Sequence, residues 1–152
     1  MTTAQSTTER NTAAARRLVE EGFTSGDLSV CDELVAPDML EHQRGLLPGS
    51  EGLKETIGTL HRSFSDFRLD IEDMVADGDR IWIRAIGSGI NTGSFFGRPP
   101  TGCSFSITVF DQMRFRDGRI IEHWGSPDQL GLLQQLGLMG RPDAPSDNGS
   151  TT

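Results

Sequence analysis

The sequence of 152 residues contains no long hydrophobic run, and this absence excludes a helix that crosses a membrane. No stretch approaches the roughly 18 consecutive apolar residues that such a helix needs. The first residues, MTTAQSTTERNTAAARR, are polar and lack the apolar segment of a secretory signal. We therefore expect no membrane partner.

Lysine and cysteine are also scarce. Lys54 is the only lysine, so arginine carries almost all of the positive charge, and the formal net charge is -8. A surface with this excess of negative charge does not favour binding to phosphate groups, so we expect no nucleic-acid partner. The two cysteines, Cys31 and Cys103, do not form a CxxC motif, so neither a disulfide framework nor a zinc site is expected. A reduced pair in the cytoplasm is the simplest interpretation.

The length fits a single domain, and the hydrophobic periodicity changes near residue 66. Before it, helical spacing predicts helices over 8–23, 28–35 and 50–64, the last with Leu53, Ile57, Leu60 and Phe64 on one face. After it, a period of two predicts strands over 67–75, 81–90, 103–115 and 119–124, followed by a short helix over 128–137. The segment 37–49 is expected to be a loop. The domain is expected to span 8–140, between disordered tails over 1–7 and 141–152.

Helices followed by an antiparallel meander are typical of an α+β fold. A strongly curved sheet with the helices laid across its concave face would form a cone with an interior. Polar side chains that share a strand face with apolar ones are therefore candidates for a site inside it.

Asp111 is the first such candidate, because it alternates along its strand with apolar residues, namely Phe105, Ile107, Val109 and Met113. Loss of solvent would raise the pKa of a carboxyl group in this row, as a general base requires. The alternative is a structural carboxylate paired with an arginine.

His123 is the second candidate. It shares a face with Ile121 and Gly125 on the strand next to that of Asp111, so the two side chains should be neighbours. His42 lies in the loop where the mouth of a cone would be, and it could face the same space. A structural histidine with satisfied hydrogen bonds is the alternative for His123. Trp124 points the opposite way, toward a helix or a second subunit.

Arg84 shares a strand face with Trp82, Ile86 and Ser88, and an arginine in such a row needs a partner. Asp111 is the expected partner, unless Arg84 faces water at an edge. Glu41, next to His42, is expected to be exposed rather than catalytic. The side chains expected to contact substrate are Arg84, Glu41, Trp82, Val109, Met113 and Phe96.

No GxSxG, P-loop, HExxH or dinucleotide-binding motif is present. Two histidines and Asp111 could in principle hold a metal. Their spacing does not support it, so we expect neither a metal nor a cofactor.

The whole pattern resembles the SnoaL-like polyketide cyclases of the nuclear transport factor 2-like superfamily. The resemblance runs from about residue 10 to 138 and is carried by APDMLEH, GRPPTG and FDQMRFRDGRIIEHWGSPDQLGLLQQLG. It implies a cone-shaped α+β fold with one deep pocket, and commonly a homodimer or homotetramer packed through the sheet. It also implies a cofactor-free intramolecular aldol closure of an aromatic polyketide ester.

The resemblance also implies a difference at the site. Gly125 occupies the position of the family's key aspartate, Asp111 that of a pocket histidine, and Glu41 that of a loop asparagine. We therefore expect a cyclase of secondary metabolism in which Asp111 is the base, His123 or His42 assists it, and Arg84 stabilises enolate charge. The alternatives are epoxide opening, isomerisation or hydroxylation on the same scaffold, or a binding protein without catalysis.

Overall fold

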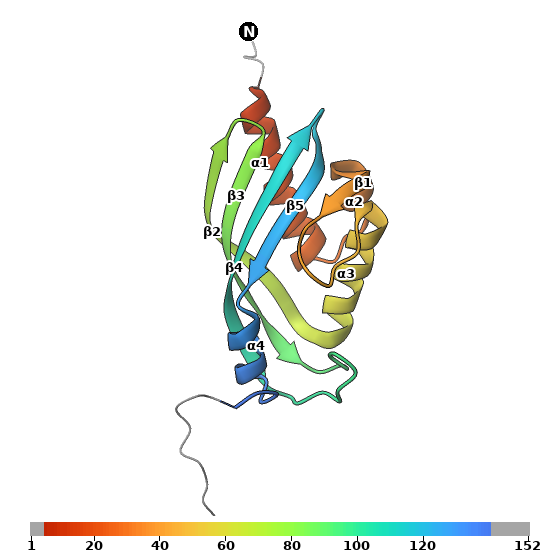
Figure 1. Ribbon diagram of the computed structural model, residues 1–152, viewed down its shortest axis with the longest axis vertical. Coiled ribbons are helices and arrows are strands. Elements are labelled where there is room, and N and C mark those ends of the chain that lie inside the picture. The colour runs from red at the N-terminus through yellow and green to blue at the C-terminus, as the bar shows by residue number, and fades with distance from the viewer. Residues whose placement is uncertain (1–4, 141–152) are drawn as a thin grey trace, which may run out of the picture.

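The computed structural model describes residues 5–140 and confirms the expected order of helices and strands (Figure 1). Helix α1 (Thr7–Arg17) continues as the π-helical turn η1 (Leu18–Thr24), and α2 (Ser29–Leu34) and β1 (Val35–Glu41) follow. Helix α3 (Gly49–Ser63) leads into four long strands, which are β2 (Phe64–Asp77), β3 (Arg80–Asn91), β4 (Ser104–Arg116) and β5 (Arg119–Pro127). The short helix α4 (Gln129–Gln135) comes last.

The five strands form one sheet in the order β1-β5-β4-β3-β2. Strands β2 to β5 are the predicted antiparallel meander, whereas β1 pairs in parallel with β5 at the edge. The expectation of a loop throughout 37–49 was therefore wrong for residues 37–41. Pro37 and the charged residues around it hide this strand in the sequence, and an edge is where a sheet tolerates proline.

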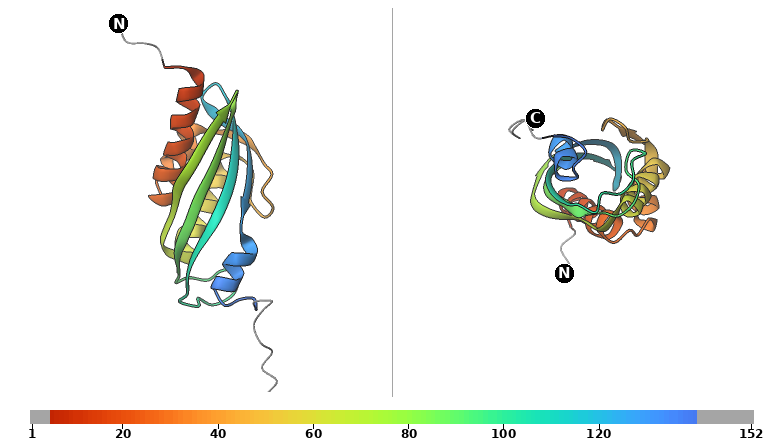
Figure 2. Two further views of the ribbon diagram at one scale, coloured as in Figure 1. Left: turned by 90° about the vertical axis from the view of Figure 1, so that its left-hand side faces the viewer. Right: turned by 90° about the horizontal axis from the view of Figure 1, so that it is seen from below.

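The sheet is curved, and α1 and α3 lie on its concave side, as the view from below shows (Figure 2). Buried side chains of the helical segments, among them Val19 and Ile57, belong to one core with Ile81, Met113 and Ile120 of the sheet. Helix α4 lies at the lower end of the molecule in Figure 1 and adds buried Leu132 and Leu136. This is the predicted α+β architecture.

Helix α1 begins at Thr7, because the side chain of Ser6 accepts a hydrogen bond from the backbone N–H of Glu9 at 3.1 Å. The helix thus starts one residue before the predicted position 8. Residues 1–4 and 141–152 of the predicted tails lie outside the described part of the chain. No helix within residues 5–140 is long and apolar enough to cross a membrane.

Candidate active site

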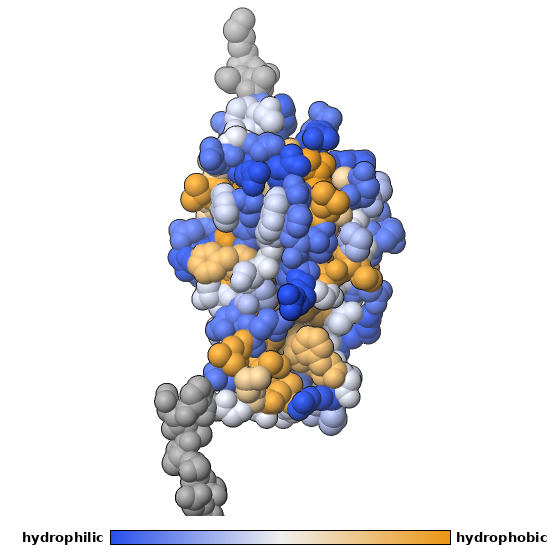
Figure 3. All heavy atoms as spheres, viewed as in Figure 1, coloured by the Kyte–Doolittle hydropathy of each residue, from blue (hydrophilic) through white to orange (hydrophobic). Residues whose placement is uncertain are grey.

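A cavity of about 950 Å³ lies between the concave face of the sheet and the helices. Its wall is mostly apolar and comes from η1, β1, α3, β2, β4, β5 and α4, with examples in Leu18, Leu53, Phe64, Phe105, Ile107 and Leu132. Apolar side chains also gather at the lower end of the molecule, over α4 and the neighbouring loop (Figure 3). A cavity of this size and lining suits an organic molecule with several rings.

A buried chain of three ionisable side chains reaches the wall of this cavity. His123 Nδ1 lies 2.8 and 2.9 Å from the two carboxylate oxygens of Glu41, and Nε2 lies 2.8 Å from Asp111 Oδ1. The side chains of Glu41, His123 and Asp111 are 1, 11 and 12% exposed. Asp111 and His123 line the cavity, whereas Glu41 lies behind them.

Strand register brings these three residues together. Glu41 of β1 pairs with His123 of β5, and His123 pairs in turn with Met113 of β4, two residues beyond Asp111. Since side chains alternate across a strand, Asp111 and Met113 share the concave face, and His123 and Gly125 do so on β5. The three groups therefore meet because three strands of one sheet align, although Glu41 is 82 residues away from His123.

Two carboxylates hold His123 in its charged form. Burial by itself lowers the pKa of His123, but the hydrogen bonds and negative charges of Asp111 and Glu41 outweigh this effect and raise the pKa to about 9. At neutral pH the ring is therefore an imidazolium that donates one N–H to each carboxylate. The charged ring thus lies between two carboxyl groups beside a mostly apolar wall.

The second carboxylate oxygen of Asp111 is available for chemistry. Oδ1 accepts the hydrogen bond from His123, while Oδ2 makes no hydrogen bond to the described residues. In the described residues, every side-chain nitrogen or oxygen atom that is shielded from solvent has a hydrogen-bond partner. Because Oδ2 has no partner, it is accessible, and Asp111 lines the cavity. A carboxylate oriented in this way can take a proton from a bound molecule.

Gly125 lies directly opposite Asp111 in the sheet. An added Cβ at Gly125 would lie 2.8 Å from Asp111 Oδ1, and it would also collide with the side-chain oxygen of Gln43. The Asp111 carboxylate therefore occupies the space beside residue 125 on the concave face. Asp111 of β4 therefore places a carboxyl group where a side chain at position 125 of β5 would lie.

Comparison with known proteins agrees with this geometry. The family model of the SnoaL-like polyketide cyclases matches residues 13–136. The chain belongs to this family. The nogalonic acid methyl ester cyclase of Streptomyces nogalater is 30% identical over 120 residues, which are 76% of this chain and 89% of that protein. The aklanonic acid methyl ester cyclase DnrD of Streptomyces peucetius is 32% identical over 128 residues, which are 80% and 87% of the two chains.

Solved structures show the same fold. The structure of wild-type IdmH, a proposed polyketide cyclase from Streptomyces antibioticus, superimposes with a TM-score of 0.73 at 35% identity. The match covers 84% of this chain and 98% of IdmH. The cone-shaped α+β fold that the sequence resemblance implied for a SnoaL-like cyclase is thus confirmed.

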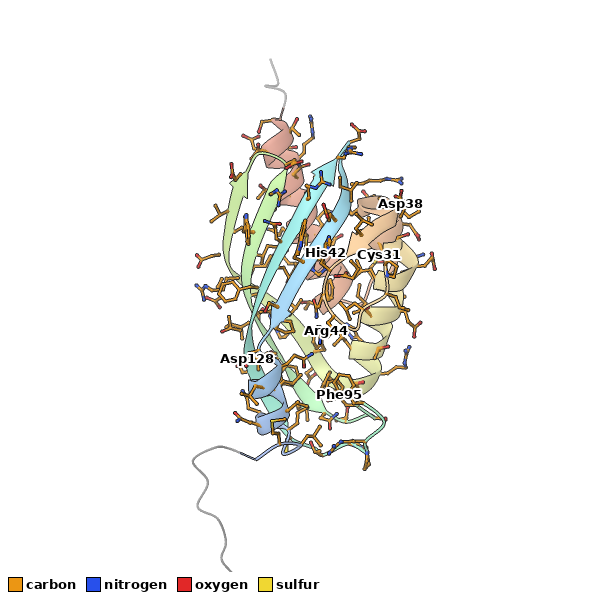
Figure 4. All side chains as sticks on the ribbon, viewed as in Figure 1. Cys31, Asp38, His42, Arg44, Phe95 and Asp128 are labelled. Atoms are coloured by element: carbon orange, nitrogen blue, oxygen red, sulfur yellow. The ribbon has the colours of Figure 1, made fainter. Side chains whose placement is uncertain are left out.

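Five of the site residues predicted for this SnoaL-like cyclase line the cavity: Asp111, His123, Val109, Met113 and Phe96. The expected proximity of Asp111 and His123 is confirmed by the hydrogen bond between them. Phe96 is 71% exposed and comes from the loop between β3 and β4, next to Phe95 near the lower end of the molecule (Figure 4).

Two of the predicted residues lie on the wrong side of the sheet. Arg84 does not meet Asp111 but donates to the Asp73 carboxylate at 2.6 Å, on the convex face. Trp82 is 52% exposed on that same face. The reason is register: Ile83 pairs with Asp111, so Ile83 shares the concave face and the residues that alternate with it point outward.

His42 is also directed away from the cavity, contrary to expectation. Its Nε2 lies 2.8 Å from Glu122 Oε2, and its ring stacks on Trp124 with a centroid distance of 4.5 Å. It lies at the start of the loop after β1, while Arg44, two residues later, reaches the cavity wall (Figure 4). Trp124 does point away from His123, as predicted, and its contacts are His42 and Arg80.

Glu41 was expected to be exposed, and the structure buries it. Once 35–41 is recognised as a strand, alternation places Met39 and Glu41 inward and Leu40 and His42 outward, so the missing signal was the strand itself. A second correction concerns β5, where Ile120 rather than Ile121 lines the cavity. The pairing shifts there by one residue, because a bulge separates the pairs at Glu122 and Ile120.

Proposed function

We propose that this chain catalyses an intramolecular aldol closure on a polyketide-derived carbonyl substrate, with Asp111 as the base. The observation that carries the proposal is the hydrogen-bonded chain Glu41–His123–Asp111, which ends with an open carboxylate oxygen at the wall of a large apolar cavity. Family membership supports ring closure as the reaction.

The reaction needs only proton transfers and one new carbon–carbon bond. Asp111 Oδ2 takes a proton from a carbon next to a carbonyl group, and the enolate attacks a second carbonyl carbon of the same molecule. The resulting alkoxide recovers the proton from Asp111, so substrate and product are isomers. These steps call for no metal or cofactor, because the group that removes the proton also returns it.

His123 and Glu41 position the base in this scheme. The imidazolium donates a hydrogen bond to Asp111 Oδ1 and so fixes the orientation of this carboxyl group, with Oδ2 facing the cavity. Glu41 fixes the ring from behind through both of its oxygens. A positioned base of this kind contributes about 10²–10⁴ in rate, and alignment of the two reacting carbons contributes more.

Methyl esters of aromatic polyketide acids are the proposed substrates, because two relatives are named as cyclases of nogalonic and aklanonic acid methyl esters. The mostly apolar wall and the volume of about 950 Å³ support a hydrophobic molecule with several rings. The same relatives support the proposal of a role in antibiotic biosynthesis.

We also propose a single domain over 8–140 that assembles as a homodimer or homotetramer through the convex face of the sheet and works in the cytoplasm. Exposed apolar side chains on that face, Val75, Trp82 and Phe110, support the assembly. Sedimentation of the protein and of Trp82→Glu tests the assembly, and a monomer in both cases would contradict it.

The two cysteines support the proposed compartment. Cys31 and Cys103 are free thiols, as expected in a reducing compartment.

The function is tested by incubating the protein with nogalonic and aklanonic acid methyl esters without added cofactor. We expect a product of unchanged mass and new retention time. Loss of CH2 would instead indicate hydrolysis of the methyl ester, a gain of water by an epoxide included in the assay would indicate epoxide opening, and a gain of one oxygen would indicate hydroxylation. Binding of the esters without any product would favour a binding protein.

A further inference from the structure

Gln43 is a polar side chain of the cavity wall that is not part of the hydrogen-bonded chain of the proposed base. An added Cβ at Gly125 would collide with the Gln43 side-chain oxygen and would lie 2.8 Å from Asp111 Oδ1. The Gln43 amide and the Asp111 carboxylate therefore border the same small space. All three residues line the cavity.

The Gln43 backbone is fixed, whereas its amide is free. The backbone N–H of Gln43 donates to Glu41 Oε1 at 2.8 Å, directly after His42 N–H continues the pairing with the His123 carbonyl at 2.9 Å. The side-chain amide makes no hydrogen bond to the described residues, and it is not sealed from solvent. It is thus anchored at one end and presents an unused donor to the cavity at the other.

Proton removal next to a carbonyl requires such a donor, because negative charge moves onto the carbonyl oxygen as the enolate forms. Both ring N–H groups of His123 are taken by carboxylates. Two hydroxyl groups of the wall also donate elsewhere, Thr56 to the Gly52 carbonyl and Ser63 to the Ser94 carbonyl. The Gln43 amide has no such competing partner.

We propose that the Gln43 amide donates a hydrogen bond to the substrate carbonyl oxygen as it becomes an enolate, and that Gly125 is required to leave room for this amide beside Asp111. The terminal torsion of a glutamine is broad, so the amide nitrogen can turn to a ligand in this space. This inference rests on the proposed aldol chemistry and assigns a second catalytic residue to it.

The test compares Gln43→Met, which keeps the length of the side chain and removes the donor, with Gln134→Met, a matched change on α4 at a residue that does not line the cavity. The measurements are kcat, KM and exchange of the substrate's acidic carbon-bound hydrogen in deuterated water. For Gln43→Met we expect kcat and exchange to fall by about 10²–10³, as for loss of one oxyanion donor, with KM nearly unchanged. Gln134→Met should retain both rates.

Gly125→Ala tests the same hydrogen bond in a second way, because it displaces the Gln43 amide without removing it. The added methyl group displaces the Gln43 side chain, so kcat should fall in the parent protein. It should fall much less when Gly125→Ala is added to Gln43→Met, because the two changes then remove one interaction. Full additivity of the two losses would overturn the requirement for Gly125.

The outcomes separate this inference from the proposed function. If the parent protein neither converts the esters nor exchanges the hydrogen, the aldol proposal fails and the role of Gln43 fails with it. If the parent is active and Gln43→Met matches it, or if only KM rises, the role of Gln43 alone is overturned. Loss of kcat in Arg44→Met, with Gln43→Met unaffected, would assign the donor to Arg44, the arginine on the cavity wall.

Discussion

His123 and His42 each lie 2.8 Å from a carboxylate oxygen, on opposite faces of the same sheet. On the concave face, the His123 and Asp111 side chains are 11 and 12% exposed. On the convex face, the His42 side chain is 40% exposed and borders water. The comparison shows that a short hydrogen bond between a histidine and a carboxylate does not by itself make a site, because only the pair on the concave face is buried beside a cavity.

The largest difference between the two faces is expected from removal of one carboxylate on each. Asp111→Asn should lower kcat by about 10²–10⁴, because the amide cannot accept the carbon-bound proton. Asp73→Asn, which removes the Arg84 partner on the convex face, should leave kcat unchanged. Steady-state rates on the methyl esters check both, and circular dichroism checks that both variants fold. An active Asp111→Asn would remove Asp111 from the role of base.

The next effect is a dependence of stability on pH. Because the pKa of His123 is raised from 6.5 in the unfolded chain to about 9 in the folded one, its protonation stabilises the fold fully below pH 6.5. This contribution, on the order of 3 kcal/mol, is lost as pH rises toward about 9. Urea unfolding between pH 6 and 10 measures it.

A pair of variants assigns that pH dependence to one face. His123→Gln should abolish this component, since no group titrates at that position. His42→Gln should change stability by at most about 1 kcal/mol, the usual range for an exposed ion pair. An unchanged pH dependence in His123→Gln would contradict the assignment.

A smaller effect is expected from the carboxylate behind the histidine. Glu41→Gln keeps the shape and an acceptor for His123 Nδ1 but removes a negative charge, so the pKa of His123 should fall below about 9. The alkaline limb of the kcat/KM profile should then move to lower pH. Glu122→Gln, the partner of His42 on the convex face, is the control and should leave that limb in place.

The smallest effect is expected at Arg84, which the sequence had suggested as a stabiliser of enolate charge. Its guanidinium pairs with Asp73 on the exposed face, so Arg84→Met should cost about 0.2–1 kcal/mol of stability and leave kcat unchanged. Chemical denaturation and the ester assay measure the two quantities. A fall in kcat of tenfold or more would contradict this expectation and would show that Arg84 on the convex face influences catalysis.

The sequence by itself determined the helices, the four-stranded meander and the alternation that puts Asp111 among apolar side chains. These features depend on residues close in the chain, whose spacing matches the period of a helix or a strand. The same local reasoning placed His123 on the strand next to Asp111. It correctly predicted their contact because a short turn joins β4 and β5.

Only the tertiary structure decided which face of each strand is concave and which distant segment completes the site. Alternation places Arg84 and Ile83 on opposite faces of the sheet, but it does not say which of the two is the concave face. Ile83 points inward because it pairs with Asp111. Glu41 reaches His123 only because β1 pairs in parallel with β5, a contact between residues 82 positions apart. The room for Gln43 beside Gly125 likewise exists only when the strand and the loop meet.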